Sequence, residues 1–71
     1  MICPNPVKDY LTIKAKDIIN IKIFSATGAM LLNEDMKDET FTIDMKVFRS
    51  GTYIIHITTK DEVIIDKITK Y

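Results

Sequence analysis

The side chains of this chain that could do chemistry are few and far apart. A single histidine, His56, stands between two isoleucines, and a single cysteine, Cys3, lies near the opposite end of the chain. A zinc site built from protein ligands needs three or four histidine, cysteine or carboxylate side chains in one place. The sequence therefore indicates no protein-only zinc site, and we expect a structural or surface role for His56.

Acidic residues form a second candidate site. Glu34, Asp35, Asp38 and Glu39 cluster around an expected loop. Paired carboxylates serve glycoside hydrolysis and also bind calcium, but the spacing here is not that of an EF-hand. Because loops of β domains lie on the surface and are commonly polar, we expect a solvated acidic loop.

Nucleophiles and phosphate-binding loops are not indicated either. Ser25, Thr27 and Ser50 would each need a base and a group to orient it, and the chain offers one histidine. The stretches "TGA" and "SGT" hold the only glycines, Gly28 and Gly51, and neither opens a helical pattern. We expect no catalytic residue, no cofactor and no metal, and a protein that is not an enzyme.

Composition narrows the classes of partner. The 71 residues include ten basic and ten acidic side chains, three tyrosines, three phenylalanines and no tryptophan. Nucleic-acid binding usually needs a basic face and stacking aromatics, so no nucleic-acid partner is expected. One cysteine allows no internal disulfide. The longest apolar run is the four residues "AMLL", so these residues contain neither a transmembrane helix nor a signal-peptide core.

The elements that position these residues are expected to be strands, because apolar and polar residues alternate almost throughout. Clear alternation covers residues 10–16, 19–25, 40–45, 52–58 and 62–70. In the second of these stretches we expect Ile19, Ile21 and Ile23 to face the core. Residues 29–36 are assigned to a strand by position more than by pattern, and residues 44–50 could form one helical turn.

Turn signals separate these stretches about every ten residues, which is typical of a sandwich or barrel. Gly28 and Gly51 lie where a positive φ is useful, and "KDET" and "TKDE" are polar turns. The sequence predicts an all-β fold, a small immunoglobulin-like β-sandwich of about six to seven antiparallel strands. It forms one domain over residues 1–71.

The stretch "CPNPV" is a stiff lead-in to this sandwich. Pro4 and Pro6 push the residues before them, Cys3 and Asn5, toward extended conformations. Neither proline can donate a hydrogen bond to a sheet, so the segment belongs to an edge and not to a central strand.

Read in order, these features resemble a known family. "PNP" precedes the first long strand, and "IKIFSATGAMLL" joins two strands through a glycine turn. "FTIDMKVFRSGTYIIHI" leads into Ser-Gly-x-Tyr, and "KITK" stands almost at the end. Together they resemble the C-terminal sorting domains of the type IX (Por) secretion system over nearly the whole chain. Ser25, Ala29 and Phe48 depart from the residues common in that family, which are aspartate, a basic residue and leucine.

The resemblance implies a recognition motif and a secretion role. The motif comprises Pro4, Asn5, Pro6, Gly28, Ser50, Gly51, Tyr53, Lys67 and Lys70. The implied partners are the type IX translocon, a sortase-like peptidase and an upstream cargo domain of the same chain. The 71 residues would then be excised from a larger secreted protein. The cargo would pass through the periplasm and end on the cell surface or outside the cell, after the peptidase removes this domain.

A different class of function stays open on the residues alone. An immunoglobulin- or fibronectin-like accessory module of a secreted enzyme or adhesin would bind carbohydrate or act as a spacer. Carbohydrate binding usually needs an exposed aromatic platform, for which Tyr10, Phe24 and Tyr71 are the candidates. Gly51 and Tyr53 also suit any sandwich, as a turn glycine and a core aromatic that resembles a tyrosine corner. Lys67 and Lys70, taken alone, are expected to be solvated strand residues.

Overall fold

The computed structural model describes residues 2–3, 6–37 and 39–71. These residues form seven strands and no helix, which confirms the all-β prediction. The strands are β1 (Ile2–Cys3), β2 (Tyr10–Lys14), β3 (Ile18–Ser25), β4 (Met30–Asp35), β5 (Thr40–Asp44), β6 (Gly51–Thr59) and β7 (Val63–Lys70).

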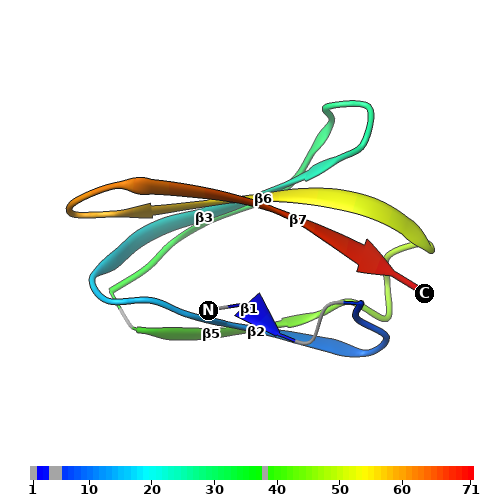
Figure 1. Ribbon diagram of the computed structural model, residues 1–71, viewed down its shortest axis with the longest axis horizontal. Helices are drawn as coiled ribbons and strands as arrows, with labels where there is room; N and C mark the ends of the chain where they lie inside the picture. Colours follow the sequence, from blue (N-terminus) through cyan, green and yellow to red (C-terminus); the bar gives the residue numbers. More distant parts are fainter. Residues whose placement is uncertain (1, 4–5, 38) are drawn as a thin grey trace.

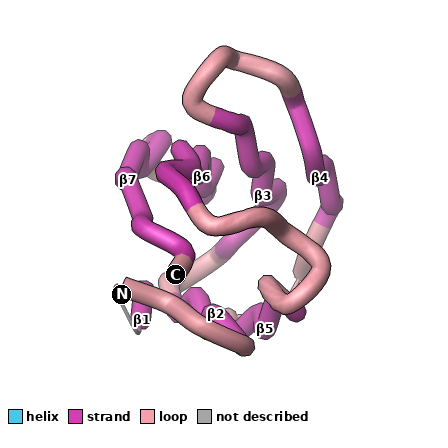
Figure 2. Tube along the Cα trace, turned by 90° about the vertical axis from the view of Figure 1, so that its right-hand side faces the viewer, coloured by secondary structure: helices cyan, strands magenta, loops and turns pink. Residues whose placement is uncertain are grey.

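The strands pair antiparallel in two sheets that face each other (Figure 1). One sheet has the order β1-β2-β5 and the other the order β4-β3-β6-β7. Figure 2 shows the two layers from the side. In immunoglobulin-like sandwiches, strands A, B and E share one sheet and strands C, F and G the other. The first sheet follows the order A-B-E with β1, β2 and β5. The second sheet follows the order C-F-G with β3, β6 and β7, and β4 lies beside β3.

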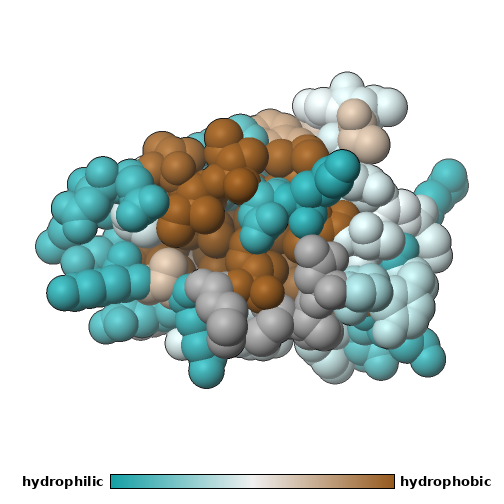
Figure 3. Space-filling view, viewed as in Figure 1, coloured by the Kyte–Doolittle hydropathy of each residue, from teal (hydrophilic) through white to brown (hydrophobic). Residues whose placement is uncertain are grey.

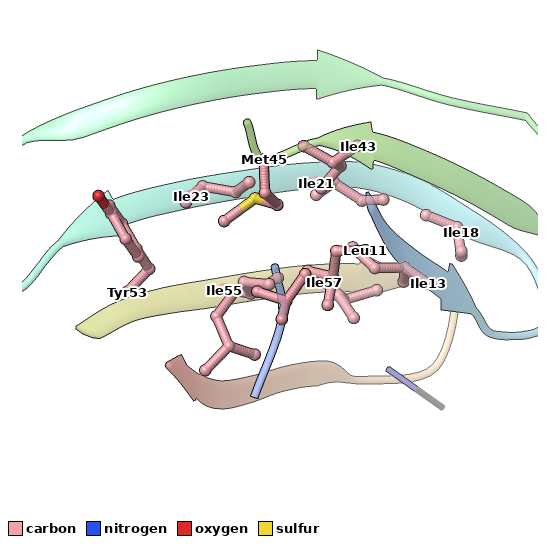
Figure 4. Close-up of a cluster of buried hydrophobic side chains, with 12 residues drawn as sticks. Leu11, Ile13, Ile18, Ile21, Ile23, Ile43, Met45, Tyr53, Ile55 and Ile57 are labelled. Atoms are coloured by element: carbon pink, nitrogen blue, oxygen red, sulfur yellow. The ribbon is translucent and has the colours of Figure 1, made fainter. Parts of the chain in front are cut away.

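Isoleucine side chains from facing strands fill the space between the sheets (Figure 4). On the four-stranded sheet, Ile21 pairs with Ile57 and Ile23 pairs with Ile55, and all four side chains are buried. Paired residues of an antiparallel sheet point to the same side, so these pairs make one continuous apolar face. The other buried apolar residues are Val7, Leu11, Ile13, Ile18, Ile43, Met45, Tyr53 and Ile68.

The expected inward position of Ile19 is wrong. Ile18 is 2% exposed and Ile19 is 45% exposed. The pairing of β3 with β6 shifts between Ile18 and Asn20, as in a β-bulge. A bulge turns the residues on one side of it to the opposite face of the sheet. This bulge comes directly after Asp17, whose φ is 56°.

Val7, between β1 and β2, joins the two sheets. Its side chain is fully buried, and its main chain forms a parallel bridge with Lys70. The Val7 N–H donates to the Thr69 carbonyl oxygen at 2.8 Å, and the Tyr71 N–H donates to the Val7 carbonyl oxygen at 3.0 Å. The lead-in before β2 therefore covers the C-terminal end of the β7 edge.

Candidate recognition surface

The lead-in part of the expected motif ends at the edge of the four-stranded sheet. Pro4 and Asn5 lie outside the described residues. Pro6 is exposed and comes directly before Val7, whose main chain pairs with β7. Pro6 is thus placed where the chain passes from one sheet to the other.

Three motif residues, Ser50, Gly51 and Tyr53, lie where the connection from β5 enters β6. Gly51 begins β6 with a φ of 151°, which residues with a side chain rarely adopt. The Tyr53 hydroxyl donates a hydrogen bond of 2.6 Å to the Arg49 carbonyl oxygen, and its ring stacks on Phe48 with 5.5 Å between centroids. Gly51 and Tyr53 therefore shape this corner, while Ser50 beside them is exposed.

Gly28 lies in the turn of the β3–β4 hairpin, with a φ of 93°. Its N–H donates to the Ser25 carbonyl oxygen at 3.0 Å, and the Ser25 Oγ accepts from the Ala29 N–H at 3.1 Å. The Ser25 and Thr27 hydroxyls are hydrogen-bonded to each other at 2.9 Å. The hydroxyls that the sequence offered as possible nucleophiles thus hold this turn.

The two motif lysines lie on opposite faces of β7. Lys67 pairs with Ile54 on the outer face and is exposed. Lys70 pairs with Gly51 on the inner face, is 9% exposed, and its Nζ donates to the Tyr71 carbonyl oxygen at 2.9 Å. The expectation that both are solvated is therefore wrong for Lys70, because a spacing of three along a strand changes the face.

Most motif residues meet at one end of the sandwich, called here the motif end. Ser25 pairs with Tyr53, Gly51 pairs with Lys70, and Lys70 bridges to Val7. Figure 1 shows the β3–β4 hairpin, the start of β6 and the end of β7 on the same side of the molecule. The motif residues placed at this end are Pro6, Gly28, Ser50, Gly51, Tyr53 and Lys70. Periodicity alone does not predict this gathering, because it depends on the order of the strands.

An open, mainly apolar pocket of about 240 Å³ adjoins the motif end on the outer face of the four-stranded sheet. Its walls include Phe24, whose ring lies 4.7 Å from that of His56 between centroids. The other lining residues are Ser25, Ala26, Gly28 and Ile54. His56 thus contacts an aromatic ring. The described residues contain no group of three or more histidine, cysteine or carboxylate side chains that could hold a metal ion.

The described acidic residues form no group of three or more that could hold a metal ion. Glu34 and Asp35 are exposed on β4, and Asp38 lies outside the described residues. The Asn20 Nδ2 donates to one carboxylate oxygen of Asp35 at 2.9 Å. The described acidic side chains therefore lie on an edge strand and in the loop after it.

The aromatic ring of Tyr10 has a lysine on one face. The Lys46 Nζ lies 4.9 Å from the ring centroid and donates to the Tyr10 hydroxyl at 3.0 Å. This hydrogen bond, together with the charges of Asp44 and Asp9, raises the pKa of Lys46 above its ordinary value of 10.5. A sugar-binding platform presents an open ring face, so this contact counts against Tyr10 in that role.

Comparisons with known proteins assign the whole of this sandwich to one family. A family model described as "Secretion system C-terminal sorting domain" matches residues 1–71. No curated protein matches the chain. The described residues include no helix that is long and apolar enough to cross a membrane.

Proposed function

Because this chain belongs to the family of secretion system C-terminal sorting domains, we propose that it directs a cargo protein across the outer membrane through the type IX secretion system. The family is one of sorting signals and not of catalysts. The observation that carries the proposal is the extent of the match, which covers both sheets of the sandwich. We infer that the machinery recognises the folded domain and not a short linear tag.

The proposal includes the fate of the domain. The cargo precedes it in the same chain and carries it through the periplasm to the translocon. A sortase-like cysteine peptidase then cleaves a peptide bond on the N-terminal side of the domain and transfers the new carboxyl end of the cargo to a surface acceptor. The prolines stand between β1 and β2 of the sandwich, so we place the cleaved bond before β1, where the cargo would join the domain.

We assign recognition to the motif end and to Lys67 beside it. The exposed residues Pro6, Gly28, Ser50 and Lys67 are available for direct contact with a receptor. The remaining residues Gly51, Tyr53 and Lys70 act by holding the shape of this end, through the positive φ and the hydrogen bonds described above.

A reporter fusion tests the function. The 71 residues are joined to the C-terminus of a fluorescent protein with an ordinary signal peptide and expressed in a bacterium that has the type IX system. The expected result is fluorescence at the surface or in the medium, with loss of the mass of the domain. A matched strain without the translocon should retain the full-length fusion in the periplasm. Retention of a folded fusion in both strains would overturn the proposal and favour an accessory module.

A further inference from the structure

The strand β7 is the outer strand of its sheet, and only part of its outer edge is covered. In an antiparallel pair, residues alternate between bonding their neighbour and pointing away from it. The Thr69 carbonyl and the Tyr71 N–H point away from β6, because both bond Val7. By this alternation the main-chain groups of Val63 and Ile65 also point to the outer edge.

The covered and open parts of the edge meet at Asp66. One carboxylate oxygen of Asp66 accepts a hydrogen bond of 2.8 Å from the Lys67 N–H, so this main-chain donor is occupied. Beyond it, Val7 covers the edge at Thr69 to Tyr71. No described residue donates to or accepts from the outward main-chain groups of Val63 or Ile65. The segment Val63–Ile65 is called here the open edge.

Apolar side chains accompany these main-chain groups. Val63 is 57% exposed and Ile65 is 63% exposed, and both lie on the outer face, paired with Thr58 and His56. Figure 3 shows hydrophobic surface gathered on the β7 side of the molecule. The open edge therefore combines unpaired donors and acceptors with an apolar surface on the outer face, and the charge that adjoins it is that of Asp66.

The other long edges of the sandwich carry more polar side chains. The strand β4 exposes Met30 and Leu31 next to the hairpin turn but ends in three exposed polar residues, Asn33, Glu34 and Asp35. The strand β5 exposes Thr40, Thr42 and Asp44. Charged and polar side chains on an edge disfavour pairing with another chain. The last three residues of β4 are polar, whereas Val63 and Ile65 bring exposed apolar side chains and open main-chain groups together. Of the two edges of the four-stranded sheet, β7 at Val63–Ile65 is therefore the better suited to accept a strand.

We propose that the open edge binds an extended segment of the secretion machinery, which adds to the sheet as a fifth strand with apolar side chains at alternate positions. The inference rests on the proposed sorting function and adds to it a contact away from the motif end. The occupant is an extended chain because the groups offered are main-chain N–H and carbonyl groups at a strand's spacing. The same edge already accepts a residue of this chain in this way, as Val7 pairs with Lys70.

Proline substitutions test the proposal in the reporter fusion. Ile65→Pro and Val63→Pro each remove an outward N–H that β6 does not use, and proline is tolerated at edge positions of this kind and at the first residue of a strand. Ile65→Ala and Val63→Ala keep the N–H and shorten the side chain. Each proline removes one main-chain hydrogen bond to the added strand and weakens the next one along the edge. We therefore expect the secreted fraction of the proline variants to fall about tenfold. The alanine variants keep these hydrogen bonds, so their secreted fraction should fall much less.

The outcomes separate this proposal from the sorting function itself. Thermal unfolding of each purified variant shows whether its fold is retained, and two positions are tested so that one misfolded proline variant does not decide the result. Secretion of the folded proline variants at the level of the unchanged domain would overturn the proposal and leave the sorting function standing. Equal losses for proline and alanine variants would also overturn it, since they would indicate side-chain recognition. Failure of the unchanged domain to be secreted would overturn both.

Discussion

The hydroxyl of Tyr53 donates a hydrogen bond of 2.6 Å to the carbonyl oxygen of Arg49, four residues earlier in the chain. This contact closes the connection from β5 to β6, at the point where the chain crosses between the two sheets. The Tyr53 ring is buried and stacks on Phe48, so the hydroxyl and the ring stabilise the same corner. Immunoglobulin-like domains have a tyrosine corner in the same place.

Tyr53→Phe should lower the free energy of unfolding by about 1 kcal/mol, because it removes one partly buried hydrogen bond and keeps the ring. Urea unfolding followed by circular dichroism at neutral pH measures the change. Tyr71→Phe is the matched control, since Tyr71 is 60% exposed and its substitution should leave stability unchanged. If both variants unfold like the unchanged domain, the hydrogen bond does not stabilise the corner.

Gly51→Ala should destabilise the domain by about 1–3 kcal/mol through backbone strain alone. The φ of Gly51 is 151°, and an added Cβ would meet nothing within 4 Å, so space is not the limit. Chemical synthesis allows a sharp control with D-alanine at this position, because its mirror-image preference matches a positive φ. We expect the D-alanine domain to be at least as stable as the glycine form in urea unfolding. A D-alanine domain as weak as the L-alanine one would rule out φ as the cause.

The alternation of apolar residues was sufficient to predict the strands and most of the buried face. Tyr53, Ile55 and Ile57 are buried at every second position of β6, as the pattern indicates. Alternation failed at Ile18 and Ile19, because two adjacent isoleucines fit either face and only the pairing with β6 decides between them. A bulge has no signal in the period of a single strand.

The candidate site was less predictable than the fold. The positive φ of Gly28 and Gly51 follows from their place in turns, and both are confirmed. The burial of Lys70 and its pairing with Val7 were not foreseen. Such contacts join residues far apart in the chain, so no local pattern reports them.

Lys67→Gln should lower secretion of the reporter fusion without changing the stability of the domain. Lys67 is an exposed motif residue on the outer face of β7, and we assign it to direct contact with the receptor. Lys60→Gln makes the same change in the turn between β6 and β7, at the other end of the sheet, and should leave secretion unaltered. Equal secretion of the two variants would remove Lys67 from the recognised surface.

Tyr10→Phe should lower the pKa of Lys46 toward its ordinary value of 10.5, because the hydrogen bond to the Tyr10 hydroxyl is the largest cause of the rise. A group whose pKa is raised on folding stabilises the fold while it is protonated. The contribution of Lys46 is therefore present at neutral pH and is lost as the pH rises beyond 10.5, through the raised pKa. NMR titration of the Lys46 side chain measures both forms, with Tyr71→Phe as the control. Identical titrations of Lys46 in the Tyr10→Phe and unchanged domains would contradict the assignment.

Asp66→Ala should cause the domain to self-associate through β7. Asp66 pairs with Ile55 on the inner face, yet its side chain is exposed, and a charge in this position discourages edge-to-edge pairing. Its carboxylate also accepts from the Lys67 N–H, so the substitution removes this acceptor from the edge beside Val63 and Ile65. Sedimentation velocity over a range of protein concentrations measures the association.

Two further variants decide which property of Asp66 protects the edge. Asp66→Asn removes the charge and keeps an oxygen that can accept from the Lys67 N–H. Asp61→Ala removes a carboxylate from the neighbouring turn and should not promote association. If Asp66→Asn stays as dispersed as the unchanged domain, the hydrogen bond is the protecting feature; if it associates like Asp66→Ala, the charge is. An Asp66→Ala domain that does not associate would show that the open edge is too short to pair with a second copy even without this residue.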